Sequence, residues 1–213
     1  IEKANGEYIS FLDDDDEWLP EKIERQLNYI SNYSVVCALP LIKKEGGEVL
    51  KMQKKEYQLG ELDIEDVFYD FSTIYPSGSL LKTEEVREVG GFDVNLTRGE
   101  YWDLILKILK NYNNAFVLKE HLVLFDRKHN LGRVSEKTDK IKDVFITYNR
   151  HKEVVSYPVQ RRRKVKLLYK KFKEKSSIKG LLKGLLIDYE FQIIRKMIKG
   201  ILVEVYNRCC RIF

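Results

Sequence analysis

Four consecutive aspartates, Asp13 to Asp16, follow a short apolar stretch at residues 7–12. Adjacent carboxylates repel one another, so the run disfavours regular structure and predicts a turn at the end of a strand. Hard cations such as Mg²⁺ or Mn²⁺ offset this repulsion, because they bind carboxylates together with the phosphates of a substrate. Ligands of α/β sheets bind at strand ends. The run therefore predicts a metal–diphosphate site.

Two other interpretations of the acidic run were compared with this one. A calcium-binding EF-hand loop needs a glycine at its sixth position, and counting from Asp13 that position is Trp18. Pro20 also interrupts the loop, so a calcium loop is excluded. A solvated acidic loop that caps a helix beginning near Pro20 is the second alternative, because proline and acidic side chains both suit a helix N-terminus.

The segment Gly6–Gln26 resembles the Asp-x-Asp segment of family 2 glycosyltransferases, with Asp13-Asp14-Asp15 as the acidic triplet. The line Gly90-Gly91-Phe92-Asp93, followed by Gly99–Leu104, resembles the second hallmark of that family. The resemblance covers residues 1 to about 135. It implies an α/β fold of the glycosyltransferase type-A kind, a mixed sheet flanked by helices. By this resemblance, we expect the chain to lack the family's first strand–helix units.

The resemblance also implies roles for individual residues at the donor. Asp13 and Asp14 would face a nucleotide-sugar donor. Asp15 would bind the metal cofactor, Mn²⁺ or Mg²⁺, since a carboxylate is a ligand that such cations prefer. Asp16 and Glu17 would support the turn.

A basic segment at residues 126–135 resembles a third part of the family pattern. By this resemblance His129 would contact the metal or the diphosphate, because imidazole is a ligand for borderline cations. Arg127, Arg133 and Ser135 would line the phosphates. The alternative is a solvated basic loop that precedes a helix.

The chain departs from the family at the general base. The family uses the aspartate of a Glu-Asp pair, and that position holds Tyr101. A tyrosine with a pKa of about 10 is a poor base at neutral pH. Glu100 and Asp103 are the candidate catalytic carboxylates, although on a helix they point about 100° and 200° away from Tyr101. Three outcomes stay open: Glu100 acts as the base, the acceptor is activated otherwise, or catalysis is impaired.

Hydrophobic periodicity predicts the remaining elements. A helix over residues 20–32 would bury Ile23, Leu27 and Ile30 on one face. Further helices are expected over 61–71, from Thr83, and over 99–112. Apart from 7–12, strands are expected at 34–42, 49–53, 77–81, 115–118 and 122–125.

Charge divides the chain into two parts. Residues 160–213 contain 16 Lys and Arg and 4 Asp and Glu, a net charge of +12, whereas the remainder carries −7. Apolar residues recur at helical spacing in this stretch, so we expect a catalytic domain at 1–135 and a basic amphipathic helical tail at 136–213. Such a tail suits an anionic membrane surface, although packing against the domain is the alternative. No RNA-binding motif is present, and nucleic acid is not the expected partner.

The resemblance to family 2 glycosyltransferases implies one function. The chain would transfer a sugar from a nucleotide-diphosphate donor to a hydroxyl of a carbohydrate or lipid-linked acceptor, with inversion, in bacterial cell-surface polysaccharide synthesis. The three cysteines lack metal-ligand spacing, which favours a reducing compartment, and no run of about 18 apolar residues occurs. We therefore expect a cytoplasmic protein, peripheral at the inner face of the plasma membrane. The alternative function is a truncated, non-catalytic transferase domain that binds a membrane or a partner.

Overall fold

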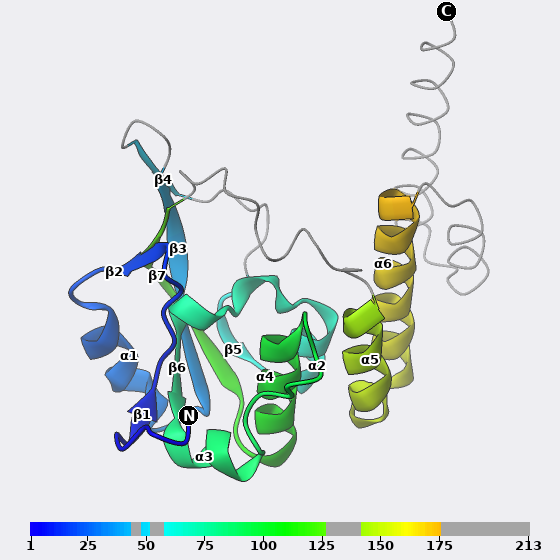
Figure 1. Cartoon of the computed structure of the whole chain (residues 1–213), viewed down its shortest axis with the longest axis horizontal. Helices are drawn as coiled ribbons and strands as arrows, with labels where there is room; N and C mark the ends of the chain where they lie inside the picture. Colours follow the sequence, from blue (N-terminus) through cyan, green and yellow to red (C-terminus); the bar gives the residue numbers. More distant parts are fainter. Residues whose placement is uncertain (44–47, 52–57, 127–141, 176–213) are drawn as a thin grey trace, which may run out of the picture. The chain divides into compact units, whose positions relative to one another are not determined.

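The computed structural model describes residues 1–43, 48–51, 58–126 and 142–175 (Figure 1). The chain forms two compact units, residues 1–155 and 156–213. The first unit contains the sheet and the site discussed below. The described part of the second unit is a single helix, α6 (Tyr157–Lys175).

Seven strands form the sheet of the first unit. In chain order they are β1 (Tyr8–Ile9), β2 (Asp16–Trp18), β3 (Val35–Lys43), β4 (Val49–Lys51), β5 (Gly60–Leu62), β6 (Ser79–Lys82) and β7 (Ala115–Asp126).

The strand order is β1-β6-β3-β7-β2, with β4 paired to β3 and β5 paired to β7. The central pair β3–β7 is parallel, with Val35 opposite Ala115, and the other pairs are antiparallel. β3 begins with Val-Val-Cys-Ala, and these four residues are fully buried. A strand that is apolar on both faces belongs in the middle of a sheet that is covered on both sides. The predicted mixed sheet is confirmed.

Five α-helices accompany the sheet in the described parts of the first unit: α1 (Lys22–Ile30), α2 (Ile64–Tyr69), α3 (Thr83–Glu88), α4 (Glu100–Asn111) and α5 (Lys142–His151). Short 3-10 turns occur at η1 (Phe71–Thr73), η2 (Pro76–Gly78) and η4 (Lys152–Val154).

The helices cover both faces of the sheet. Figure 1 shows α1 on one side and α2 with α4 on the other. Ile30 of α1 packs in a buried cluster with Val36, Leu80, Leu118 and Leu122 of the sheet. On α4 the core positions predicted from helical spacing are buried, as expected: Trp102, Ile105, Leu106 and Leu109.

Three predicted elements differ from the structure. The stretch 7–12 forms only the two-residue strand β1, and its one partner among the described strands is β6. The expected strands 115–118 and 122–125 are one strand, β7, which continues through a register shift against β3: His121 pairs with Leu39, and its Nδ1 lies 2.9 Å from the Pro40 carbonyl oxygen. The expected helix 61–71 starts later, since Asp63 and Asp66 form a capping box that begins α2 at Ile64.

The first unit extends through Val155 and so includes α5 and η4, which the sequence analysis assigned to the tail. The predicted boundary after residue 135 lies outside the described residues and stays a prediction. Within the described ranges, no helix combines the length and the apolar character needed to cross a membrane.

Candidate functional site

The acidic run lies in the segment that connects β1 to β2, the strands at the two ends of the strand order. β1 pairs with β6, whereas β2 pairs with the carboxyl-terminal half of β7, with Asp16 opposite Phe125. Residues 10–15 connect these two strands. The backbone N–H of Asp16 donates to the carbonyl of Asp13 at 3.1 Å and closes a tight turn. The predicted turn is therefore present, but it leads directly into β2, and residues 10–12 separate it from the end of β1.

The residues around η2 hold this acidic turn in place. The backbone N–H of Asp13 donates to Oγ of Ser77 at 3.1 Å, and the indole N–H of Trp18 donates to the Ser77 carbonyl at 2.8 Å. Ser10 also donates to the carbonyl of Ser79. Both ends of the turn are thus fixed to one short segment, which limits how far the carboxylates between them can move.

A buried lysine completes this support, and the sequence analysis missed it. Lys22 is fully buried, and its Nζ donates to Oε1 of Gln26 at 2.8 Å and to Oγ of Ser10 at 3.2 Å. It also lies 4.3 Å from the ring centroid of Trp18. Burial lowers the pKa of Lys22 to about 8, because a desolvated ammonium group is disfavoured.

The buried face of α1 differs from the predicted one, because Lys22 and Gln26 lie on it. The buried positions are Lys22, Gln26 and Ile30, whereas Leu27, which was predicted to be buried, is 44% exposed. Gln26 donates to the carbonyls of Val36 and Gly78, both at 2.7 Å, so the polar side chains on this face are satisfied. In the sequence, the polar pair Lys22 and Gln26, spaced four apart beside the acidic run, was the signal that could have indicated this buried polar face.

Three carboxylates of the turn are close enough to share a cation. Oxygen atoms of Asp13, Asp15 and Asp16 all lie within 4.8 Å of one another. Burial raises the pKa of Asp13, and the charges of Asp15, Asp14 and Glu100 raise it further. The group thus holds like charges at close range, and its all-oxygen donor set fits Mg²⁺ or Mn²⁺. Asp14 is exposed and is not one of these three.

The N-terminus of α4 approaches the acidic turn. The charge of Glu100, the first residue of α4, contributes to the raised pKa of Asp13. The ring of Phe11, which precedes the acidic turn, lies 6.2 Å from the ring of Tyr101, edge to face. Oε2 of Glu100 is buried, and no hydrogen-bond partner for it occurs among the described residues. The contact of Phe11 with Tyr101 thus places the start of α4 beside the segment that leads into the acidic turn.

Tyr101, at the family's base position, is enclosed by aromatic rings. It is 4% exposed and contacts Phe11, Phe71 and Phe92. Burial raises the pKa of Tyr101 well above its usual value. A phenol that stays protonated cannot accept a proton from an acceptor hydroxyl at neutral pH.

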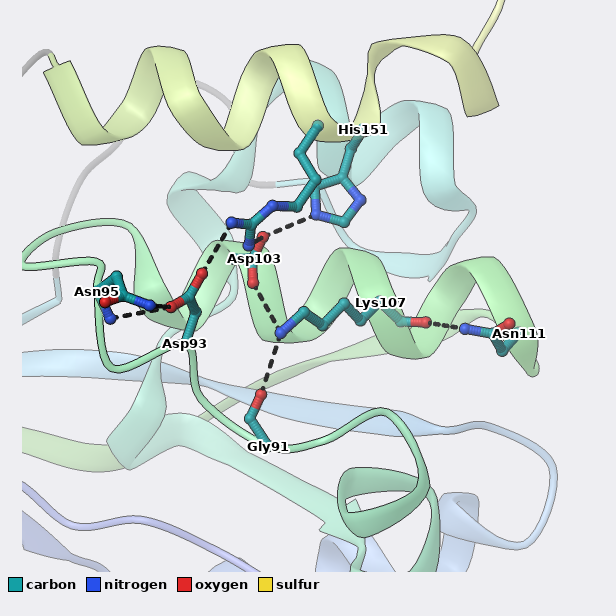
Figure 2. Close-up of polar contacts among 8 residues, drawn as sticks. Gly91, Asp93, Asn95, Asp103, Lys107, Asn111 and His151 are labelled. Carbon is teal, nitrogen blue, oxygen red and sulfur yellow. Dashed lines mark hydrogen bonds and ion pairs between the residues drawn. The ribbon is translucent and has the colours of Figure 1, made fainter.

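Asp103, the second predicted catalytic carboxylate, is fully buried in an ion-pair network (Figure 2). Its Oδ1 accepts from Nη1 of Arg150 and Nε2 of His151, both at 2.8 Å, and its Oδ2 lies 3.0 Å from Nζ of Lys107. Burial alone would raise the pKa of Asp103, but the contacts with His151 and Lys107 and the charge of Arg150 lower it to about 2. A carboxylate this acidic is a weak base, so its predicted catalytic role is not favoured by the geometry.

The remaining predicted site residues, Arg127, His129, Arg133 and Ser135, lie outside the described residues. Their roles at the metal and the phosphates stay predictions.

Comparison with known proteins matches residues 1–183 to a family model described as glycosyltransferase like family 2. An uncharacterized glycosyltransferase of Methanocaldococcus jannaschii is 26% identical over 140 residues, 62% of this chain and 47% of that protein. The amylovoran biosynthesis glycosyltransferase AmsB of Erwinia amylovora is 28% identical over 114 residues, 50% of this chain and 38% of that protein. The chain spans less than half the length of these curated relatives.

The fold is also similar to solved structures of TarS from S. aureus. The complex of TarS residues 1–349 with UDP-GlcNAc has a TM-score of 0.58 and 14% sequence identity, covering 81% of this chain and 50% of that chain. The complex with UDP has a TM-score of 0.55 and 13% identity, covering 81% of this chain and 49% of that chain. At these identities the likeness shows a shared fold, which agrees with the predicted type-A arrangement.

Proposed function

Because the chain belongs to the glycosyltransferase like family 2, we propose that it transfers a sugar from a nucleotide-diphosphate donor to an acceptor hydroxyl, with inversion at the anomeric carbon. The observation that carries this proposal is the acidic turn, in which oxygens of Asp13, Asp15 and Asp16 lie within 4.8 Å of one another, next to the start of α4, where Phe11 contacts Tyr101. A group that binds the leaving diphosphate and a group that accepts a proton are both needed for a direct displacement. The two segments supply one of each.

The acidic turn is the donor side of the proposed site. Asp15, with Asp13 and Asp16, would hold Mn²⁺ or Mg²⁺, and the cation would neutralise the charge of the diphosphate leaving group. Asp13 and Asp14 would position the donor. The bonds from Ser77 and Trp18 fix the turn, so little rearrangement is needed when a donor binds. The TarS complexes with UDP-GlcNAc and UDP support a nucleotide-sugar donor.

Glu100 lies on the acceptor side of the proposed site. Its buried Oε2 is the oxygen that would take the proton of the acceptor hydroxyl. The acceptor oxygen then attacks the anomeric carbon while the bond from that carbon to the diphosphate oxygen breaks on the opposite face, which inverts the configuration. The aromatic enclosure and raised pKa of Tyr101 support Glu100 over Tyr101 in this role.

The wider role is proposed from the name of one relative and from the charge of the chain. AmsB is named for amylovoran biosynthesis, which supports a carbohydrate or lipid-linked acceptor and a part in bacterial surface polysaccharide synthesis. The exposed Arg162, Lys164 and Lys166 of α6 belong to the basic stretch 160–213, whose charge suits an anionic membrane at the cytoplasmic face.

A non-catalytic transferase domain that binds a membrane or a partner is the second candidate. The observation in its favour is Tyr101 at the expected base position. This candidate predicts that nucleotide binding, turnover or both are lost although the chain folds.

The test is calorimetric titration of the protein with UDP and GDP, each with and without Mn²⁺. We expect metal-dependent binding of one nucleotide that disappears in Asp15→Ala. Glu120→Ala is the matched control, because it removes a carboxylate that is 44% exposed and pairs with Arg25, with no part in the acidic turn. Binding that does not need the metal, or that survives in Asp15→Ala, contradicts the donor site. No binding by a folded protein favours the non-catalytic candidate.

A further inference from the structure

Helix α5 contacts both sides of the position that Glu100 occupies. Near the start of α5, Oδ2 of Asp143 accepts from the backbone N–H of Thr97 at 2.9 Å and from its hydroxyl at 2.6 Å. At its end, Arg150 and His151 donate to Asp103. Thr97 lies three residues before Glu100, in the loop that leads to α4, and Asp103 follows Glu100 by about one helical turn. Glu100 therefore begins a helix whose first turn is attached to α5.

Arg150 joins two segments that are separate along the chain. Its Nη2 donates to Oδ2 of Asp93 at 2.7 Å, and its Nη1 donates to Oδ1 of Asp103 at 2.8 Å. Asp93 lies in the turn after Gly91, and Figure 2 shows its carboxylate also bonded to Asn95 within that turn. A single planar guanidinium thus fixes the distance between the turn that leads to α4 and the first turn of α4.

Lys107 makes a related but weaker link. Its Nζ lies 3.0 Å from Oδ2 of Asp103 and donates to the Gly91 carbonyl at 3.3 Å (Figure 2). Lys107 reaches backbone in the turn, whereas Arg150 reaches the Asp93 carboxylate. Among the described contacts, only Arg150 forms hydrogen-bonded ion pairs with both carboxylates. A lysine has a point charge and no fork of donors, so it would not hold both in one geometry.

We propose that Arg150 is a positioning residue for sugar transfer, holding the first turn of α4 so that Glu100 faces the acidic turn. This inference rests on the proposed function and extends it to a residue 50 positions after Glu100 in the chain. Arg150 does not itself contact the acidic turn in any of its described interactions. Asp103 shares this role, because it is the buried partner through which α5 holds α4.

The test compares wild type with Arg150→Gln and Arg150→Lys, and with Arg25→Gln as the matched control. Arg25 makes an ion pair with Glu120 on the exposed surface. The substitution Arg25→Gln removes the same charge as Arg150→Gln. Three quantities are measured on each: the Kd of UDP or GDP with Mn²⁺, kcat and KM for nucleotide release from UDP- and GDP-sugars, and amide hydrogen exchange at residues 97–104. Exchange in α1 serves as the internal reference for global unfolding.

We expect Arg150→Gln to lower kcat on the order of 10–100-fold, with the nucleotide Kd unchanged, and to speed exchange at residues 97–104 but not in α1. Arg150→Lys recovers little of the kcat, whereas Arg25→Gln behaves as wild type. A merely structural role would speed exchange and leave kcat intact, and that result would overturn the inference. Unchanged exchange at residues 97–104 would overturn it irrespective of turnover.

Failure of the proposed function is a separate result, since it is seen in wild type. If wild type releases nucleotide from none of the sugars although it binds UDP or GDP with Mn²⁺, the transfer reaction is absent, and the inference fails with it. If wild type is active and only the expected loss in Arg150→Gln is missing, the inference alone fails.

Discussion

The carboxylates of Asp13 and Glu100 lie near enough for the charge of Glu100 to raise the pKa of Asp13. These residues come from different parts of the chain, one from the turn after β1 and one from the first turn of α4. A like charge nearby disfavours the ionised form of a carboxyl group. In the proposed reaction this pair would lie between the cation and the reacting hydroxyl.

Replacing Glu100 distinguishes proton transfer from nucleotide binding in the proposed reaction. We expect Glu100→Gln to lower kcat on the order of 10²–10⁴-fold, because the proton acceptor is lost. The Kd of UDP with Mn²⁺ should stay equal or improve, since a negative charge near Asp13 is removed. Steady-state kinetics and calorimetry measure the two effects. Glu120→Gln is the control, and a Glu100→Gln variant with wild-type kcat would exclude Glu100 as the base.

Asp103 should make the free energy of unfolding depend on pH in the acidic range. Its pKa in the folded protein is about 2, below the ordinary value of 3.8. Its contribution is therefore present above pH 3.8 and is lost as the pH falls toward 2, and for a carboxylate in this position it is on the order of 2 kcal/mol. Urea unfolding between pH 2 and 6 measures this.

Removal of the Asp103 carboxylate should also lower the free energy of unfolding at neutral pH. Asp103→Asn leaves Arg150, His151 and Lys107 around a neutral group, and we expect a loss of roughly 3 kcal/mol at pH 7. The variant should also show a flatter acid limb than wild type. If the slopes of the two proteins coincide below pH 4, the network does not hold Asp103 ionised in solution.

The sequence predicted the framework of this fold well where apolar patterning was long. β3 and α4 are apolar enough that burial decides their structure, and both were identified with boundaries near the observed ones. At α1 the apolar pattern predicted Ile30 and Ile23 correctly but was wrong for Leu27, because Lys22 and Gln26 occupy part of the buried face and bond the segment under the acidic turn. Apolar periodicity does not reveal a buried polar network of this kind.

Part of the candidate site was predicted in the same way. The acidic turn and Glu100 follow from motif order, whereas the roles of Arg150 and His151 do not, because they depend on how α5 returns to α4. Asp103 was predicted as a candidate catalytic carboxylate, and helical spacing alone does not reveal that Lys107, Arg150 and His151 surround it.

Lys22 should make stability rise with pH in the alkaline range. Its pKa falls from 10.5 in the unfolded chain to about 8 in the folded protein. Between these values the unfolded chain binds more protons, so the free energy of unfolding increases with pH. We expect Lys22→Met to lack this increase between pH 8 and 9.5 in urea unfolding. A rise of equal slope in both proteins would show that Lys22 is not desolvated as described.

Two glycines offer a matched test of the start of α4. Gly99 and Gly90 have φ of +78° and +79°, a region that costs other residues roughly 1–2 kcal/mol. A Cβ on Gly99 would meet only Thr147 and Val144, at 3.8 Å, and one on Gly90 would meet nothing within 4 Å.

Both substitutions, Gly99→Ala and Gly90→Ala, should therefore destabilise the protein by about 1 kcal/mol. Only Gly99→Ala should also lower kcat, because Gly99 is the N-cap residue that directly precedes Glu100. Thermal unfolding and kinetics measure the two effects. An equal loss of kcat in both variants would indicate that general destabilisation, and not the direction of the first helical turn, is responsible.

The bridge made by Arg150 has a consequence for how the protein is synthesised. Asp13, Glu100 and Arg150 leave the ribosome in that order, so a nascent chain that ends before α5 exposes Asp93 and Asp103 with no arginine between them. The sheet closes once β7 has been translated, because β7 pairs with β3. The first turn of α4 acquires its final attachment only when α5 emerges. The contacts that attach α4 to Arg150 therefore need a longer nascent chain than the pairing that closes the sheet.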